Sequence, residues 1–330
     1  MSDFTRDIKG TSGKRPDSMV FWQLNNLCNF RCEYCFCGEE KLSKEHPDCG
    51  KYGPAHIAGC FNDTGKVWQV HMSGGEPFLY PKFVDLCAEL TKGHFISLNT
   101  NLSTLNVREF ANRISPDKVV FLNAGFHKTA REKNPAGIDH FIEKVLILQE
   151  KGFNIDVGYL TYPRLLEKMA LDVKYLKSRG IKLVNAKTFR GYHNGKKYPA
   201  AFTREEKEFI YKYSLDPREE KVMNTSVNYF GNPCRTGMDY FRMDPSGNLY
   251  RCSSSYKRYG NLLKGKYTPD KTPAPCPLID CTCPYEGFKY VSAGEASVIR
   301  VAGEVLNEIC GFPNRGVSLR KVGRYVRKRF

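Results

Sequence analysis

The sequence predicts an α/β fold in which a partial barrel of six strand-helix units precedes a small cysteine-rich hairpin domain. Short apolar runs of β-rich composition alternate with amphipathic helical patterns between residues 19 and 190. Gly152 and Gly180 stand at the ends of two of these helical patterns, where a left-handed cap residue is favoured. Beyond residue 190 the alternation stops, and two short alternating runs flank a turn at residues 244–248, which is typical of a β-hairpin.

The predicted elements follow in chain order. The strands are expected within residues 19–25, 66–75, 94–101, 118–127, 154–163 and 181–189. The helices between them are expected within residues 81–90, 106–114, 138–152 and 165–180. Strand-helix-strand crossovers of this length favour a parallel sheet, which closes into a partial TIM-like (β/α)6 barrel. A capping box from Thr203 to Glu206 predicts a further helix that runs to about Ser214.

Length and composition suit one large domain with a small one attached. The chain has 330 residues, of which 41% are hydrophobic and 26% charged. We expect a polar N-terminal extension (1–18), the barrel (19–190), a linker and helix (191–230), an auxiliary cysteine-rich domain (231–290), and a C-terminal helix with a basic tail (291–330). No run approaches the roughly 18 apolar residues of a membrane span, and the first 18 residues are polar, so a cytoplasmic location is expected.

The net charge of +16 favours anionic partners. Seven positive charges fall between Arg315 and Arg329, so the excess is partly a property of the tail. In this basic segment Leu319, Val322, Val326 and Phe330 recur near helical spacing. Such a helix could contact a membrane surface, which would make the protein peripheral to the membrane, or it could dock on the barrel.

The thirteen cysteines include a tight group, Cys28, Cys32 and Cys35, with the spacing C-x3-C-x2-C. Clusters of this kind in a reducing compartment are more often metal or iron-sulfur ligands than disulfides. Three thiolates leave one metal position open, whereas a structural zinc site needs a fourth ligand, for which Cys37, His46 or Cys49 is available. Cys60, Cys87 and Cys310 stand apart and, with Cys49, are expected to be plain thiols.

A second motif, Ser73-Gly-Gly-Glu-Pro77, follows the second predicted strand. Its glycines allow close approach of the backbone to a ligand, and Pro77 fixes the turn. Sites in parallel βα folds lie at the carboxyl ends of the strands, so both motifs fall where chemistry is expected.

With these two motifs in this order, the chain resembles the radical SAM superfamily. Cys28, Cys32 and Cys35 match the three ligands of a [4Fe-4S] cluster, and Tyr34 matches the aromatic residue that packs against adenine. Gly74, Gly75, Glu76 and Pro77 match the turn that binds the methionine part of S-adenosylmethionine (SAM). The resemblance implies that SAM chelates the open iron and is cleaved reductively to a 5′-deoxyadenosyl radical, which takes hydrogen from a substrate.

Polar residues after the next two strands look like further cofactor contacts. Asn99, Thr100 and Asn101 resemble the ribose-contacting positions of the family, although polar strand ends are common in parallel sheets. After the fourth strand the family often has a serine, which is absent here, and Asn123 is the expected substitute. His127 is either a polar rim residue or a substrate contact.

The second cysteine group resembles the SPASM or twitch extension of radical SAM enzymes. Cys234 and Cys252 flank the predicted hairpin. With Cys276, Cys281 and Cys283 they would hold one auxiliary iron-sulfur cluster, and which of the last three bind it is open. A zinc ribbon is the alternative, because cysteines also close its hairpins.

Composition and chain organisation also predict a class of substrate and a type of reaction. The basic balance and the short N-terminal extension favour a sugar-like, lipid-linked or other small anionic substrate, oxidised or epimerised with the help of the auxiliary cluster. A peptide maturase is the alternative of the same class, and a flavodoxin or ferredoxin is the expected electron donor. An RNA-binding or RNA-modifying protein with structural zinc is the alternative of another class, although nucleic acid is a less expected partner because much of the charge lies in the tail.

Overall fold

The computed structural model describes residues 16–35, 37, 39–42, 44–133, 137–215, 223 and 230–278. Its centre is a ten-stranded sheet in the order β13-β12-β11-β10-β1-β2-β3-β4-β5-β6. The six predicted barrel strands are confirmed, and each pairs in parallel with the next. They are β1 (Ser18–Gln23), β2 (Trp68–Ser73), β3 (Phe95–Thr100), β4 (Val119–Gly125), β5 (Ile155–Leu160) and β6 (Val184–Lys187). A mostly parallel sheet with crossover helices is consistent with a partial TIM-like barrel.

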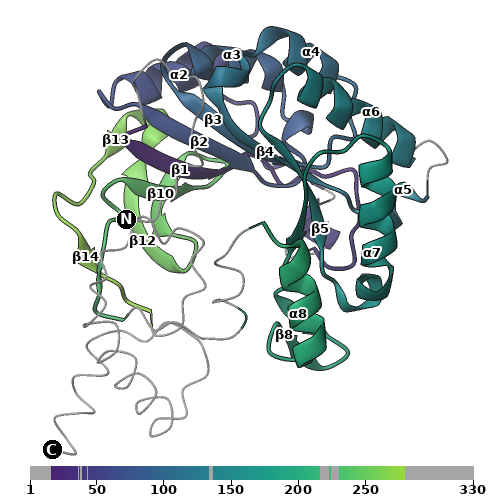
Figure 1. Ribbon diagram of the computed structural model, residues 1–330. Helices are drawn as coiled ribbons and strands as arrows, with labels where there is room; N and C mark the ends of the chain where they lie inside the picture. The colour runs from purple at the N-terminus through teal and green to yellow at the C-terminus, as the bar shows by residue number, and fades with distance from the viewer. Residues whose placement is uncertain are drawn as a thin grey trace, which may run out of the picture.

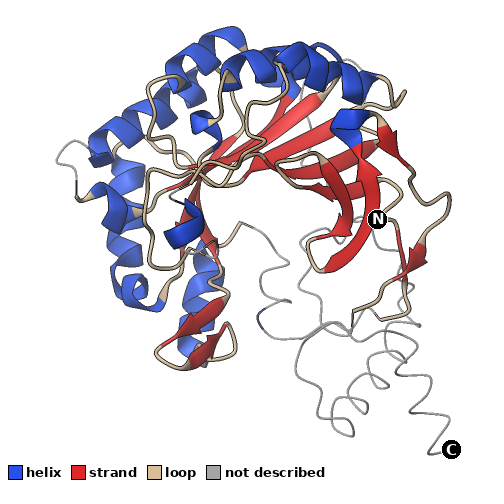
Figure 2. Ribbon diagram, turned by 180° about the vertical axis from the view of Figure 1, so that it is seen from behind, coloured by secondary structure: helices blue, strands red, loops and turns tan. Residues whose placement is uncertain are grey.

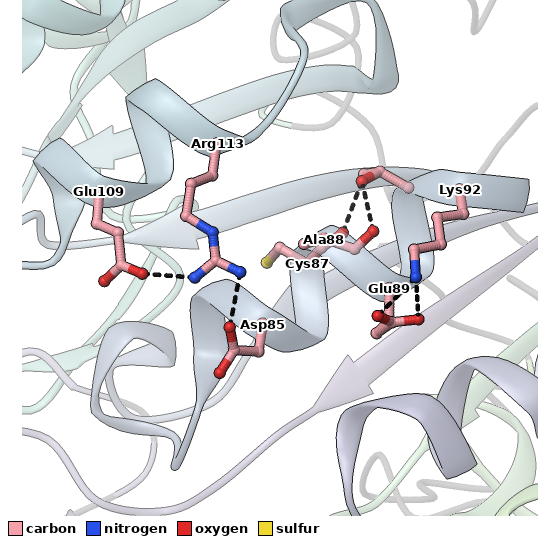
Figure 3. Close-up of polar contacts among 8 residues, drawn as sticks. Asp85, Cys87, Ala88, Glu89, Lys92, Glu109 and Arg113 are labelled. Atoms are coloured by element: carbon pink, nitrogen blue, oxygen red, sulfur yellow. Dashed lines mark hydrogen bonds and ion pairs between the residues drawn. The ribbon is translucent and has the colours of Figure 1, made fainter.

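The helices of the βα units line the outer face of the curved sheet (Figure 1). They include α2 (Pro54–Asn62), α3 (Phe83–Gly93), α4 (Val107–Arg113), α6 (Gly137–Glu150) and α7 (Pro163–Ser178), with short α1 (Glu39–Leu42), α5 (Lys128–Arg131), η1 (Pro77–Leu79) and η2 (Pro116–Lys118) in the connections. Arg113 of α4 donates to Asp85 of α3 at 2.7 Å and to Glu109 of its own helix at 2.5 Å (Figure 3). The exposed contact with Asp85 joins the neighbouring helices α3 and α4.

The predicted hairpin is β10 (Tyr240–Met243) and β11 (Asn248–Cys252), which pair in antiparallel fashion. β10 also pairs in parallel with β1, so the hairpin continues the barrel sheet, whereas the sequence placed it in a domain of its own. β12 (Ser255–Asn261) and β13 (Lys266–Tyr267) extend the same edge, with η3 (Leu262–Lys264) between them.

Two small sheets stand outside the large one. β7 (Gly191–His193) pairs with β8 (Lys196–Tyr198), and β9 (Pro233–Cys234) pairs with β14 (Ala274–Pro275). In chain order, α8 (Arg204–Tyr213) comes between β8 and β9. Its predicted capping box is confirmed: Thr203 Oγ1 accepts from Glu206 N, and the Glu206 carboxylate accepts from Thr203 N.

The two faces of the sheet differ in chemistry. Val70 and Met72 of β2 point to the helices and join a core that contains Trp22, Trp68 and Phe61. The alternate residues Gln69 and His71 point to the opposite, concave face, away from the outer layer of helices (Figure 2). Polar side chains therefore occupy the face on which a ligand can lie.

Several predictions fall outside the described residues. They concern the N-terminal extension up to residue 15, Cys281, Cys283, Cys310 and the basic tail. Within the described part of the chain, no helix is both long enough and apolar enough to span a bilayer. Cys87 is fully buried, while Cys49 and Cys60 are half-buried free thiols, as predicted for cysteines outside the two groups.

Candidate active site

The glycine-rich turn and the first cysteine loop are joined through their backbones. Leu24 N donates to Ser73 O at 2.9 Å, Gly75 N to Asn25 O at 3.1 Å, and Glu76 N to Leu27 O at 2.8 Å. These bonds extend the β1–β2 pairing beyond the strands as far as the residue before Cys28. The turn therefore determines where the cysteine loop begins.

The glycines are needed for this contact itself. A Cβ at Gly75 would lie 2.0 Å from Leu27 O, and one at Gly74, whose φ is +143°, would lie 2.5 Å from Asn25 O. No other residue fits at such distances from backbone atoms. The sequence predicted that these glycines make room for a ligand; what the structure shows is that they make room for the cysteine loop.

Cys28, Cys32 and Cys35 are half-buried in one loop, and none of them forms a disulfide. Cys35 N donates to Cys32 O at 3.0 Å, and Cys28 N donates to Leu42 O at 3.1 Å, so the loop is held at both ends. Burial raises the pKa of the Cys28 thiol, and burial raises that of Cys32 to about 11. The charge of Cys35 also raises the pKa of each of these two thiols, so all three cysteines interact electrostatically.

Donors directed at sulfur fit a thiolate-bound cluster. Phe30 N lies 3.4 Å from Cys28 Sγ, and Asn101 Nδ2 lies 3.8 Å from it. Hydrogen bonds to the sulfurs are among the means by which a protein tunes an iron-sulfur cluster. Among the described residues no three His, Cys, Asp or Glu side chains gather as ligands of one metal ion. A cubane spreads its thiolates over separate irons, so its ligands need not gather around one ion.

Glu76 is buried, and both of its carboxylate oxygens accept hydrogen bonds from the protein. Its Oε1 accepts from Thr100 Oγ1 at 2.6 Å and from Phe78 N at 3.1 Å, and its Oε2 accepts from Asn101 N at 2.6 Å. Burial raises the pKa of this carboxyl, while the three hydrogen bonds oppose the increase. The side chain thus joins the end of β2 to the end of β3.

Arg131 is a buried cation that the sequence analysis missed. Its guanidinium donates to the carbonyls of Asn101, Phe126 and Gly125, and it lies 3.9 Å from the centroid of the Phe141 ring. Burial lowers its pKa to about 9, and the charge of Glu76 opposes that decrease. It holds the ends of β3 and β4 together. Nothing in its local sequence, a short helix after β4, distinguishes it from a surface arginine.

Tyr34 lies between two residues from other strand ends. Its hydroxyl is 3.1 Å from His127 Nδ1, its ring stacks on the imidazole at 5.9 Å, and it tilts against the Tyr162 ring at 5.3 Å. Desolvation and then the charge of Arg131 lower the pKa of His127 to about 4. His127 is therefore a neutral partner of Tyr34. The Tyr162 hydroxyl in turn lies 2.7 Å from Nδ1 of His193 in β7, a contact that the sequence did not indicate.

Of the predicted ribose contacts, Asn99 and Asn123 are brought together on the concave face, with Asn123 Nδ2 3.1 Å from Asn99 Oδ1. Asn101 lies instead beside the cysteine loop, because its amide donates to Asn29 Oδ1 at 3.1 Å as well as to Cys28. The side chains after β3 thus divide between the cluster loop and the open face.

Three cysteines of the second group lie among the described residues, on neighbouring segments. Ala274 of β14 is paired with Cys234 of β9, and Cys276 N donates to Asn232 O at 2.8 Å, which brings Cys234 and Cys276 onto adjacent segments. Arg251, next to Cys252, donates to Ala274 O at 2.6 Å and to Thr236 O at 3.2 Å. Three of the five predicted ligands, Cys234, Cys252 and Cys276, are therefore buried in one region, and the other two lie outside the described residues.

Comparison with known proteins agrees with this geometry. Residues 22–173 match the family model described as the radical SAM superfamily. The chain contains a radical SAM domain. The radical SAM domain spans β1 to α7 and includes both motifs, the cysteine loop and the glycine-rich turn. No curated protein matches the sequence.

Solved structures resemble the fold of this chain. Native anSMEcpe with bound AdoMet (SAM) has 14% identity and a TM-score of 0.53, over 75% of this chain and 78% of that one. Streptococcus suis SuiB bound to S-adenosylmethionine has 14% identity and a TM-score of 0.54, over 75% of this chain and 64% of SuiB. SuiB bound to its precursor peptide SuiA has 16% identity and a TM-score of 0.50, over 76% and 64%. At these identities the likeness concerns the fold.

Proposed function

We propose that this chain is a radical SAM enzyme in which Cys28, Cys32 and Cys35 hold a [4Fe-4S] cluster whose fourth iron binds SAM. The observation that carries the proposal is the backbone ladder between the glycine-rich turn and Leu27, which supports the cysteine loop beside the turn expected to bind SAM. Bound together, the cluster and SAM would supply a 5′-deoxyadenosyl radical for hydrogen abstraction.

The surrounding residues would orient SAM and exclude water. Glu76 and Arg131 hold the carboxyl ends of β2, β3 and β4 in one arrangement, so the groups that face the ligand are preorganised. Tyr34, supported by His127 and Tyr162, would cover the adenine. Asn99 and Asn123 would meet the ribose, and the backbone of residues 74–77 would meet the methionine part.

We further propose that the second cysteine group holds one auxiliary iron-sulfur cluster of the SPASM or twitch kind. Support comes from the burial of Cys234, Cys252 and Cys276 in one region, where Arg251 bonds to both neighbouring segments. Cys281 or Cys283 would supply a fourth thiolate. Such a cluster could accept an electron from a substrate radical, which makes the overall reaction an oxidation.

For the substrate we favour a peptide. The fold neighbour SuiB has been solved with a precursor peptide, and the concave face of the sheet is lined by groups able to bond to amides. The β7–β8 hairpin follows β6, the terminal strand of the large sheet, and is joined to Tyr162 through His193. Its side chains Tyr192, Lys196 and Lys197 are exposed. Residues 189–198 contain no acidic side chain, so this hairpin suits an acidic peptide segment. The sugar-like or lipid-linked substrate expected from composition stays a prediction.

The test uses anaerobically reconstituted protein. We expect about eight irons per chain and the formation of 5′-deoxyadenosine when SAM and dithionite are added. Changing Cys28, Cys32 and Cys35 together to Ala should remove about four irons and abolish 5′-deoxyadenosine. Cys60→Ala, a half-buried thiol on α2, is the control that should change neither. SAM cleavage that survives the triple substitution would refute the proposal.

A further inference from the structure

A buried arginine of β11 is connected to the second cysteine group through one threonine. Arg251 Nε donates to Thr236 Oγ1 at 3.2 Å, and Thr236 Oγ1 lies 3.2 Å from Cys234 Sγ. All three side chains are buried. The guanidinium also donates to two backbone oxygens, Thr236 O at 3.2 Å and Ala274 O at 2.6 Å. These bonds fix the guanidinium against β14 and against the residues that follow β9.

The direction of the hydrogen bond between Thr236 and Cys234 follows from the state of the sulfur. A guanidinium has no acceptor atom, so Thr236 Oγ1 accepts from Arg251 and keeps its own hydrogen for another partner. Between a hydroxyl and a neutral thiol, either atom can donate. A metal-bound cysteine is a thiolate, which has no hydrogen and can only accept. When Cys234 binds a metal, Thr236 is therefore the donor.

Arg251 is also a buried cation whose hydrogen bonds to the described residues all go to neutral oxygens. Asp270 interacts electrostatically with Arg251, but the Asp270 carboxylate accepts hydrogen bonds from Lys257 Nζ at 3.0 Å and from the Tyr259 hydroxyl. Buried charges in proteins are normally paired with an opposite charge or lie at a metal site. A cluster held by thiolates is an anion, and at Cys234 it would supply this opposite charge.

We infer that Arg251 and Thr236 raise the reduction potential of the auxiliary cluster. The inference rests on the function proposed for the second cysteine group. Reduction adds one negative charge to the cluster, and a hydrogen bond to the Cys234 thiolate and a buried cation behind that hydrogen bond both stabilise the added charge. Burial alone has the opposite effect, because an environment of low polarity disfavours a further charge. The two residues thus make the cluster a better electron acceptor than its enclosure alone would allow.

The first test uses protein with Cys28, Cys32 and Cys35 all changed to Ala, in which the auxiliary cluster would be the only iron site. A redox titration followed by EPR measures its potential. Thr236→Val removes the hydroxyl and keeps the shape of the side chain. The equilibrium constant for one-electron reduction should then fall about tenfold, which is a decrease of about 59 mV.

Two substitutions control for the change of side chain at Thr236. Thr236→Ser keeps the donor and should restore most of the potential. Thr188→Val is the matched control, since Thr188 is also buried but its hydroxyl has no partner among the described residues. Its potential should equal that of the parent protein. A decrease in Thr236→Ser as large as that in Thr236→Val would overturn the role of the hydroxyl.

The charge of Arg251 is tested separately. Arg251→Gln removes the positive charge and should lower the potential, whereas Arg251→Lys keeps the charge and should lower it less. Equal decreases in the two variants would show that packing, and not charge, is responsible. Pulsed EPR of the reduced protein in D2O observes the donor itself, because Thr236→Val should lose one exchangeable deuteron coupled to the cluster. An unchanged deuteron signal would contradict a bond from Thr236 to the thiolate.

The outcomes distinguish this inference from the proposed function. If the parent protein holds about four irons in a reducible cluster, but Thr236→Val and Arg251→Gln leave its potential unchanged, the inference is overturned and the auxiliary cluster stands. If the parent protein holds zinc or no metal, the auxiliary cluster and the inference fail together.

Discussion

Cys28, Cys32 and Cys35 are half-buried on a loop beyond the end of β1, whereas Cys234, Cys252 and Cys276 are buried, at 3%, 9% and 6% exposure. The first group follows directly on residues whose backbone is hydrogen-bonded to the glycine-rich turn. The second is enclosed by short strands and by Arg251. Accessible thiols suit a cluster that must meet SAM, and enclosed thiols suit a cluster that only exchanges electrons or holds structure.

The largest expected effect comes from removing the second group alone. Cys234→Ala combined with Cys252→Ala should lower the iron content by about four and abolish product, while uncoupled formation of 5′-deoxyadenosine persists. Iron analysis and chromatography of the nucleoside measure both quantities. Cys87→Ala, an equally buried thiol on α3, controls for the loss of buried volume. If iron is unchanged in the double variant, the second group binds zinc or no metal.

A smaller and more local effect should follow from Gly75→Ala. The added Cβ would meet Leu27 O at 2.0 Å, so the cysteine loop must shift, at a cost of roughly 1–3 kcal/mol. We expect iron to be lost from the first group and retained in the second, as read by EPR of the reduced protein. Gly59→Ala in α2 has open space around its Cβ and should be neutral or slightly stabilising. Equal loss of both clusters would show that the two groups are not independent.

The smallest effect concerns the change in the free energy of unfolding with pH that His71, on the concave face, contributes. His71 has its pKa lowered to about 4, so between pH 6.5 and 4 the unfolded state binds a proton that the folded state does not. The contribution of the neutral histidine to the free energy of unfolding is fully present above about pH 6.5. It decreases as the pH falls, by about 1.4 kcal/mol at pH 5.5. Urea unfolding at pH 7.5 and 5.5 should show a smaller decrease for His71→Gln. An identical decrease would mean that His71 is protonated in the folded state.

Local patterns predicted much of the first region. The six strands, their helices and the capping box at Thr203 follow from periodicity and short motifs, and each is confirmed. The reason for Gly75 was only partly predictable, because the atom it approaches, Leu27 O, belongs to a segment 48 residues earlier in the chain. Sequence spacing indicates that a glycine is needed but does not identify the neighbouring atom.

Long-range pairing explains most of what the sequence did not predict. That β10 pairs with β1 could not be read from either strand, since the pairing joins residues more than 200 positions apart. The polar residues of the concave face had a signal in the sequence. Strands buried on both faces are near-continuously apolar, yet polar residues alternate along β2 and β3, and β4 contains Asn123, which indicates a functional face.

The central claim is that three thiolates leave one iron of the first cluster open to SAM. Mössbauer spectra of ⁵⁷Fe-reconstituted Cys234→Ala/Cys252→Ala protein, in which the first cluster would be the only iron site, test this directly. One iron of the four should change its isomer shift when SAM is added, because it gains nitrogen and oxygen ligands. Four irons that all remain unchanged by SAM would contradict the account.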